Sequence, residues 1–447
     1  MTPLREIEPT VTGILLLGDF RGVDAGAPPD EAPLRARPLH AIDRDDLDAV
    51  LARLAPAVHL PGDEVGPPVG IDLRELEDFD PDRLVERVPL LQTLREERAR
   101  PSPPAPPGAA DPAGPPPDPA RFTAEAGGSL LDQIVDDAAP SNGVGLPRDE
   151  GALAEFIRRA VEPHRVPPED PRIEEARRAI DRELHRQLRR ILHHPRFQAV
   201  EAHWRGLDLL VRRLETGPGL KLFIVQATPA ELQALGADGF AELLETSART
   251  ALEGEPWSLA LPLHGVSAGE KGLAFARAMV EASARTGVPF AAEVQSSFLD
   301  LLDLPADDPF ARGWKALRTE EGARGLTLLL PRLLLRLPWS RNENPCETIE
   351  LDEFPEGADV DRARLLWGHP GFAAALLAGS AGRGSRIEGL PIGIHAGAEG
   401  AEALPHTEIE LDTESARALA ALGLAPVLSR PGEGWVAVAP FRPIAAA

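Results

Sequence analysis

The chain has no tyrosine and a single cysteine, Cys346, among its 447 residues. One cysteine excludes an intramolecular disulfide and any metal site built from several thiolates, and it suits a reducing compartment. No histidine stands beside this cysteine in the sequence, so we expect an inert thiol. No run approaches eighteen apolar residues, and the first residues lack a basic stretch followed by an apolar one. We therefore predict a cytoplasmic protein without membrane insertion.

Basic residues are fewer than acidic ones. The chain has 47 Lys and Arg against 71 Asp and Glu, a formal net charge of −24. This balance disfavours nucleic acid as a partner, because phosphates are repelled unless a local basic patch intervenes. Solubility alone also accounts for the charge. The length of 447 residues is enough for two or three domains with a sizeable core. Hydrophobic residues make up 43% of the chain, which argues against disorder over most of its length.

Motifs that carry chemistry are weak. The glycine-rich run Gly379-Ser-Ala-Gly-Arg-Gly384 lacks the Gly-Lys-Ser/Thr of a phosphate-binding loop, so a flexible connection explains it better. Several histidines gather in one stretch, but no cysteine or carboxylate completes a zinc-site spacing; they are His185, His193, His194 and His203. We therefore predict no catalytic, cofactor-binding or metal-binding residues, and no cofactor.

The stretch from Ile191 to Val211 organises the chain. Its sequence predicts the end of one helix, a break at Pro195 and a second helix. Apolar residues at three- and four-residue steps form one stripe on each helix: Ile180, Leu184, Leu188 and Ile191, then Phe197, Val200, Trp204, Leu207 and Val211. Glycine within a helix costs about 1 kcal/mol, so we expect another backbone to approach closely at Gly206.

Arginines lie mostly off the first of these stripes. They are Arg182, Arg186, Arg189 and Arg190. Such a face suits solvent or a partner, and the sequence leaves both open.

Residues 1–100 are predicted to form a compact α/β module. The run Gly13-Ile-Leu-Leu-Leu-Gly-Asp-Phe20 is typical of a buried strand. A helix is expected after Asp43, a half-buried strand over 70–76, and a further helix beginning at Pro81. The order strand, helix, strand, helix favours one α/β unit.

A proline-rich linker, residues 101–120, follows this module. Ten of the nineteen residues 101–119 are proline, which excludes a helix or an inner strand. At roughly 3.1 Å per residue in the polyproline II conformation, the segment spans about 60 Å. It can let the flanking halves pack together in one chain or engage neighbouring copies.

Residues 121–145 are predicted to be an exposed segment with one short amphipathic helix. Leu130, Leu131, Ile134 and Val135 form its apolar stripe, with Asp132 facing away. A helix this short is marginal alone, so the stripe needs a groove. That groove lies either on the protein's own surface or on a partner.

Residues 146–447 form the predicted large module. Strands are expected over 220–226, 257–262 and 288–293, with a helix over 269–286. The pattern predicts mixed sheets flanked by helices, a scaffold compatible with many functions.

Several motifs resemble the contractile sheath of bacterial type VI secretion systems. The run HPRFQAVEAHWRGLDLLV, with LLPRLLLRLPW, LWGHPGF and IEGLP, resembles its large subunit over nearly all of residues 129–443. Three segments near the N-terminus resemble the small subunit, in that family's order: ILLLGDFRG, IDRDDLDAVLARLAP and LEDFDPDRLVERVPLLQTLRE. We therefore predict an α/β protein in which two sheath-type modules, normally separate chains, are joined by the proline-rich linker.

The resemblance implies a structural protein and not an enzyme. Sheath subunits polymerise into a helical tube around an inner tube and power injection by contraction. The expected partners are other copies of the chain, the inner-tube protein, baseplate components and an AAA+ unfoldase. The resemblance assigns unfoldase recognition to Leu130, Leu131, Asp132, Ile134 and Val135. We take as candidate subunit-interface residues Ile14, Leu15, Leu16, Leu17, Trp204, Arg205 and Gly206.

One departure from the family leaves an alternative open. In the family, the segment matching Trp435–Phe441 is followed by a C-terminal region that helps to lace subunits together, whereas this sequence stops at Ala447. The alternative function is a non-contractile adaptor or cap at the baseplate of the same apparatus. An enzyme on a similar scaffold is a further, less favoured alternative.

Overall fold

The computed structural model describes residues 12–23, 32–63, 66–100, 171–295, 298, 304–305, 307–380, 386–438 and 443–445. The chain forms two compact units, one of Met1–Arg83 with Ile191–Ala447 and one of Leu84–Arg190. The predicted linker at 101–120 and segment at 121–145 lie outside the described residues, as does most of the glycine-rich run at 379–384. The module boundaries at residues 100, 120 and 145 therefore stay predictions.

A nine-stranded sheet forms the centre of the first unit, and the N-terminal strand lies inside it. Strand β1 (Thr12–Gly18) runs parallel between β5 (Leu220–Gln226) and β6 (Leu259–Pro262). In this register Leu16 lies opposite Ile224 on one side and Leu261 on the other. A strand buried on both faces needs an unbroken apolar run, which β1 has.

The sheet continues on both sides of these three strands. Beyond β6 follow β7 (Phe290–Glu293), β8 (Leu326–Leu330) and β14 (Ala425–Ser429), all parallel, and beyond β5 the antiparallel β2 (His40–Ile42). The other edge consists of β15 (Trp435–Val438) and β11 (Arg386–Glu388), paired antiparallel. Smaller two-stranded pairs are β3 (Ala57–Leu60) with β4 (Val69–Asp72), β9 (Leu333–Leu334) with β10 (Trp367–Gly368), and β12 (Ile394–Gly397) with β13 (Gly400–Ala403).

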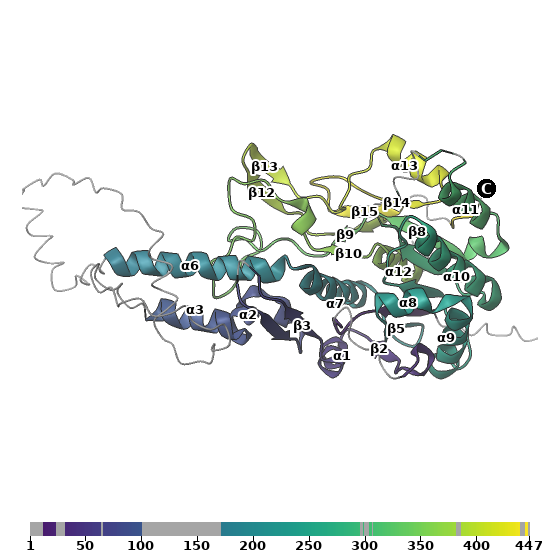
Figure 1. Ribbon diagram of the computed structural model, residues 1–447, viewed down its shortest axis with the longest axis horizontal. Coiled ribbons are helices and arrows are strands. Elements are labelled where there is room, and N and C mark those ends of the chain that lie inside the picture. Colours follow the sequence, from purple (N-terminus) through teal and green to yellow (C-terminus); the bar gives the residue numbers. More distant parts are fainter. Residues whose placement is uncertain are drawn as a thin grey trace, which may run out of the picture. The chain divides into compact units, whose positions relative to one another are not determined.

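Helices cover both faces of this sheet (Figure 1). On one face α9 (Gly236–Ala251) and α10 (Glu270–Thr286) share a core with Leu15 and Leu17 of β1. Successive strand residues point to opposite faces, and on the other side α12 (Gly371–Gly379) contacts β6, β7 and α7 (Pro195–Arg213). Shorter helices are α1 (Leu47–Leu54), α8 (Pro229–Ala234), α11 (Pro309–Leu317) and α13 (Thr413–Ala421). The predicted mixed α/β fold is confirmed.

The second unit contains two helices that run side by side (Figure 1). They are α3 (Pro89–Ala99) and α6, which spans Pro171–Leu192 and so continues into the first unit; an ion pair between Arg98 and Asp181 joins them. Helix α2 (Pro81–Arg87) precedes α3. Ile180, Leu184 and Leu188 of α6 are buried, as the apolar stripe predicts.

Candidate functional site

The N-terminal strand is part of the large module's sheet. Side chains Ile14, Leu15, Leu16 and Leu17 are all 0% exposed. At the strand's end, the backbone N–H groups of Leu263 and Ala227 donate to the carbonyls of Leu17 (2.7 Å) and Gly18 (2.8 Å). The strand therefore has hydrogen-bonded neighbours on both sides, and the sheet without it would be split between β5 and β6.

The turn after β1 is fixed by helix α7. The indole Nε1 of Trp204 donates to the carbonyl of Phe20 at 2.9 Å, and His203 Nδ1 lies 3.0 Å from the carbonyl of Asp19. Gln226 adds to this, because its Oε1 accepts from the N–H of Phe20 (2.9 Å) while its Nε2 donates to Asp19 Oδ1 (2.7 Å). Trp204 is completely buried. The Gly-Asp-Phe motif and the Trp-Arg-Gly motif thus contact each other directly.

A row of alternating charges continues from α7. Arg205 donates through Nη2 to Asp80 Oδ1 and through Nε to Glu201 Oε1, both at 2.7 Å. Arg336 then donates through Nε to the same Glu201 oxygen (2.8 Å) and through Nη1 to Glu353 Oε2 (2.7 Å). We call these five residues, Asp80, Arg205, Glu201, Arg336 and Glu353, the charge ladder.

The pKa values of the carboxylates at the two ends of the charge ladder shift in opposite directions. Burial alone would raise the pKa of Glu353, but Arg336 and the hydrogen bond with His193 lower it to about 2. Burial also disfavours a charged Arg336, and the two carboxylates outweigh that effect and raise its pKa. At the outer end, burial raises the pKa of Asp80 despite the contact with Arg205. Glu201, Arg336 and Glu353 are buried. Each of them stays ionised only while its partners are present, because a single buried charge without a partner has a high free energy.

Gly206 has a different neighbour from the one expected. A Cβ atom at this position would lie 2.1 Å from the ring of Phe372, so the close approach is that of an aromatic side chain and not of a backbone. The expectation of a backbone neighbour is therefore wrong. Phe372 belongs to the LWGHPGF motif, so a further sequence motif meets α7 at this point.

These contacts bring the candidate interface residues together within one chain. The side chains of Ile14 to Leu17 are buried in the sheet. Helix α7 contacts the neighbouring segments: Trp204 donates to the carbonyl of Phe20, Arg205 donates to Asp80, and Gly206 lies against Phe372. Their role between subunits stays a prediction. The five residues assigned to the unfoldase helix, Leu130, Leu131, Asp132, Ile134 and Val135, lie outside the described residues.

Sequence reasoning did not identify the charge ladder. The available signal was the four-residue spacing of Glu201 and Arg205, which places both on one face of a helix. Arg336 and Glu353 come from distant segments, and nothing in their local sequence pairs them.

One sequence motif, which contains Ser267, is typical of catalytic serines, although we predicted no catalytic residues. Gly265-Val-Ser-Ala-Gly269 fits the Gly-x-Ser-x-Gly pattern and connects strand β6 to helix α10, as in hydrolases that use a serine nucleophile. Such a serine needs a base within hydrogen-bond reach. The nearby His264 contacts Gln233 at 2.7 Å, and the two ring nitrogens of His369 lie 3.0 Å from the backbone nitrogens of Glu293 and Gly371. Among the described residues, neither of these histidines is hydrogen-bonded to Ser267.

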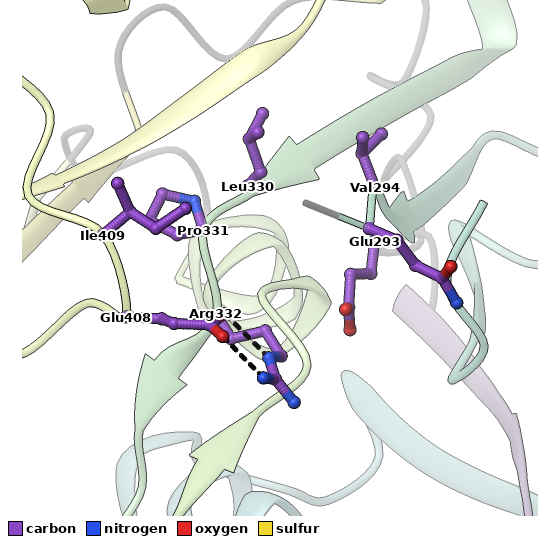
Figure 2. A pocket seen from close by; sticks show the side chains of 8 residues that line it. Glu293, Val294, Leu330, Pro331, Arg332, Glu408 and Ile409 are labelled. Atoms are coloured by element: carbon purple, nitrogen blue, oxygen red, sulfur yellow. Dashed lines mark hydrogen bonds and ion pairs between the residues drawn. The ribbon is translucent and has the colours of Figure 1, made fainter. Parts of the chain in front are cut away.

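A cavity of about 310 Å³ opens where β7 and β8 end. Figure 2 shows Arg332 bonded to Glu408 at two points, with the side chain of Glu293 extending beside them. Burial raises the pKa of Glu293 to about 7, with Arg332 opposing the shift and Glu408 adding to it. No cluster of three or more potential metal ligands occurs in the part of the chain that the structure describes.

Comparison with known families decides what this fold belongs to. The family model described as VipB, EvpB/VC_A0108, tail sheath N-terminal domain, matches residues 174–439, more than half of the chain. The chain belongs to this tail sheath family. A second model, described as type VI secretion system, VipA, VC_A0107 or Hcp2, matches residues 9–101. The predicted fusion of small- and large-subunit sheath segments is thereby confirmed.

One curated relative extends this assignment. The type VI secretion system sheath protein TssC1 of Pseudomonas aeruginosa is 26% identical over 294 residues, which are 58% of this chain and 58% of that protein. The chain thus spans a little over half the length of this relative. The tail sheath family consists of structural proteins. Among the described residues, no helix is long and apolar enough to cross a membrane.

Proposed function

We propose that this protein is the building block of a contractile sheath, in which each chain supplies both the small- and the large-subunit parts. Copies polymerise into a helical tube around an inner tube, and contraction of that tube powers injection. The observation that carries the proposal is the position of β1 inside the large module's sheet, between β5 and β6. One chain then supplies both the small- and the large-subunit segments to a single sheet, and repeated heterologous contacts between such chains generate a helix.

Electron microscopy of the purified chain tests this function. Long tubes, in an extended and a shortened form, are the expected result. Discrete particles of fixed size would contradict polymerisation and favour the non-contractile adaptor at the baseplate. The Leu16→Asp variant is the control, because a charge at this fully buried position of an interior strand removes the folded subunit and with it every tube.

Contact between copies through β1 itself requires strand donation. Ile14 to Leu17 are enclosed by the sheet, so they touch a second copy only if that copy provides the strand, as in β-augmentation. We propose that Trp204, Arg205 and Gly206 take part in subunit contacts indirectly, by holding this strand and the turn after it.

We further propose that the segment around Leu130 binds an AAA+ unfoldase that recycles the contracted sheath. Its basis is the sequence pattern and the family resemblance. The apolar stripe of Leu130, Leu131, Ile134 and Val135, with Asp132 opposite, would lie in a groove of the unfoldase. A pull-down with the cognate unfoldase should capture the unaltered chain and lose the Leu131→Asp variant. Equal capture of both would contradict this role.

A further inference from the structure

The cavity at the ends of β7 and β8 combines apolar walls with charged groups. Its lining consists of Glu293, Val294, Gln295, Leu330, Pro331, Arg332, Glu408 and Ile409. Both nitrogens of Arg332 that face Glu408 are already bonded to it, at 2.8 and 2.6 Å. Figure 2 shows Glu293 projecting beside this pair without a bond to it.

The carboxylate of Glu293 makes no hydrogen bond or ion pair with any residue that the structure describes. Its backbone is nevertheless fixed, because its N–H donates to His369 Nε2 at 3.0 Å. Gly265 lies beside the side chain, since a Cβ atom there would be 3.4 Å from Glu293 Oε1, an ordinary van der Waals contact. The side chain is therefore half-buried beside the cavity and makes no ion pair with a described residue.

No neighbouring group supplies the missing positive charge. Arg332 is balanced by Glu408, which leaves one carboxylate in excess. Burial lowers the pKa of His369 to about 3 and also lowers that of His264, so both rings are neutral near pH 7. A half-buried carboxylate without an ion-pair partner is partly desolvated at a cost in free energy, and a cation that enters the cavity would relieve that cost.

The walls favour a cation with an aliphatic stem. Val294, Leu330, Pro331 and Ile409 can cover methylene groups while the charged end reaches Glu293. The chain has only three lysines, Lys221, Lys271 and Lys315, so 44 of its 47 basic residues are arginines. A guanidinium group also matches the two oxygens of a carboxylate.

We propose that this cavity is a docking site for an arginine side chain of a second copy of this chain, with Glu293 as its ion-pair partner. The inference rests on the proposed function, because a polymer places copies in contact. Each subunit would then be joined to its neighbour by one charge-assisted contact at this cavity.

Assembly measured by sedimentation tests the proposal with the full chain. The critical concentration for polymer formation is determined at pH 6.0 and pH 8.0 for the unaltered protein and for Glu293→Gln. At pH 8.0 the carboxylate is ionised, and its loss should raise the critical concentration about tenfold or more, the range of a charge-assisted hydrogen bond. At pH 6.0 the free subunit's Glu293 is mostly protonated, so the two proteins should differ less.

Two controls separate the possible outcomes. Glu321→Gln removes an exposed carboxylate outside the cavity and should leave assembly unchanged at both pH values. The melting temperature of unpolymerised Glu293→Gln should not fall, because a neutral amide replaces an unpaired carboxylate. If the unaltered chain polymerises and Glu293→Gln has the same critical concentration at pH 8.0, the docking site is refuted while the sheath function stands. If the unaltered chain forms no polymer, both are refuted.

Discussion

Arg205 shows how a single side chain can join distant parts of the sequence. It donates hydrogen bonds to Asp80 in the small-subunit segment and to Glu201 in its own helix. Glu201 also accepts a hydrogen bond from Arg336. Guanidinium groups suit this task because their donors form a rigid fork. The ladder therefore specifies which segments lie together, although each buried charge costs desolvation.

Removal of one ladder member should be costly. We expect Arg336→Leu to lower the free energy of unfolding by about 3–5 kcal/mol, because Glu201 and Glu353 would be left as buried, uncompensated charges. Urea denaturation measures the change. Arg324→Leu, at an exposed position, is the matched control and should shift stability by less than about 0.5 kcal/mol. Equal losses of stability in Arg336→Leu and Arg324→Leu would show that the charge ladder does not stabilise the fold more than an exposed arginine does.

Acid should weaken the same ladder. The folded-state pKa of Glu353, about 2, lies below its ordinary value of 4.5. Its contribution to stability is therefore fully present above about pH 5 and is lost as pH falls toward 2. Urea midpoints at pH 6 and pH 3 should show a smaller gap between the unaltered protein and Glu353→Gln at the lower pH. A gap that stays constant would contradict the lowered pKa.

Position 206 requires glycine because the ring of Phe372 leaves no room for a side chain, and not because of its backbone conformation. We expect Gly206→Ala to destabilise the fold by about 1–3 kcal/mol, because the methyl group collides with the ring of Phe372. The double variant Gly206→Ala, Phe372→Leu should regain part of the loss, since a smaller side chain frees the space. Thermal unfolding of both variants measures this, and a fully additive pair would contradict direct contact.

At the level of elements, β1 is the segment that completes the sheet. Its apolar run and closing glycine were enough to predict a buried strand, and β5 was predicted with its observed bounds. The neighbours of β1 could not be predicted from its sequence, because a continuous apolar run fits any parallel sheet that is covered on both faces. The residues that define its place, such as Trp204 and Gln226, lie far away in the chain.

The strand's contribution can be measured by shortening one side chain. We expect Leu16→Ala to cost about 2–5 kcal/mol, the range for a fully buried leucine. Leu54→Ala, at a half-buried helix end, should cost clearly less. Chemical denaturation of the two variants gives the comparison, and similar losses would argue against a central position for β1.

For the whole molecule, the sequence predicted the family and the fusion of its two segments, but not the cavity. Motif order indicated a fused sheath subunit, and both family matches confirm it. The cavity around Glu293 could not be foreseen, because its charged residues come from three separate segments that only the folded sheet brings together. Similarly, the contact of Gly206 with Phe372 depends on how α12 packs against α7.

The small- and large-subunit segments share one sheet, in which β1 lies between β5 and β6. Co-expression of residues 1–120 and 121–447 as separate chains tests this arrangement most directly, by size-exclusion chromatography and native mass spectrometry. We predict a stable complex with one copy of each piece, and aggregation of the larger piece when it is expressed alone, because its sheet would expose the edges of β5 and β6. A larger piece that folds alone, remains monomeric and does not bind the smaller one would contradict the account.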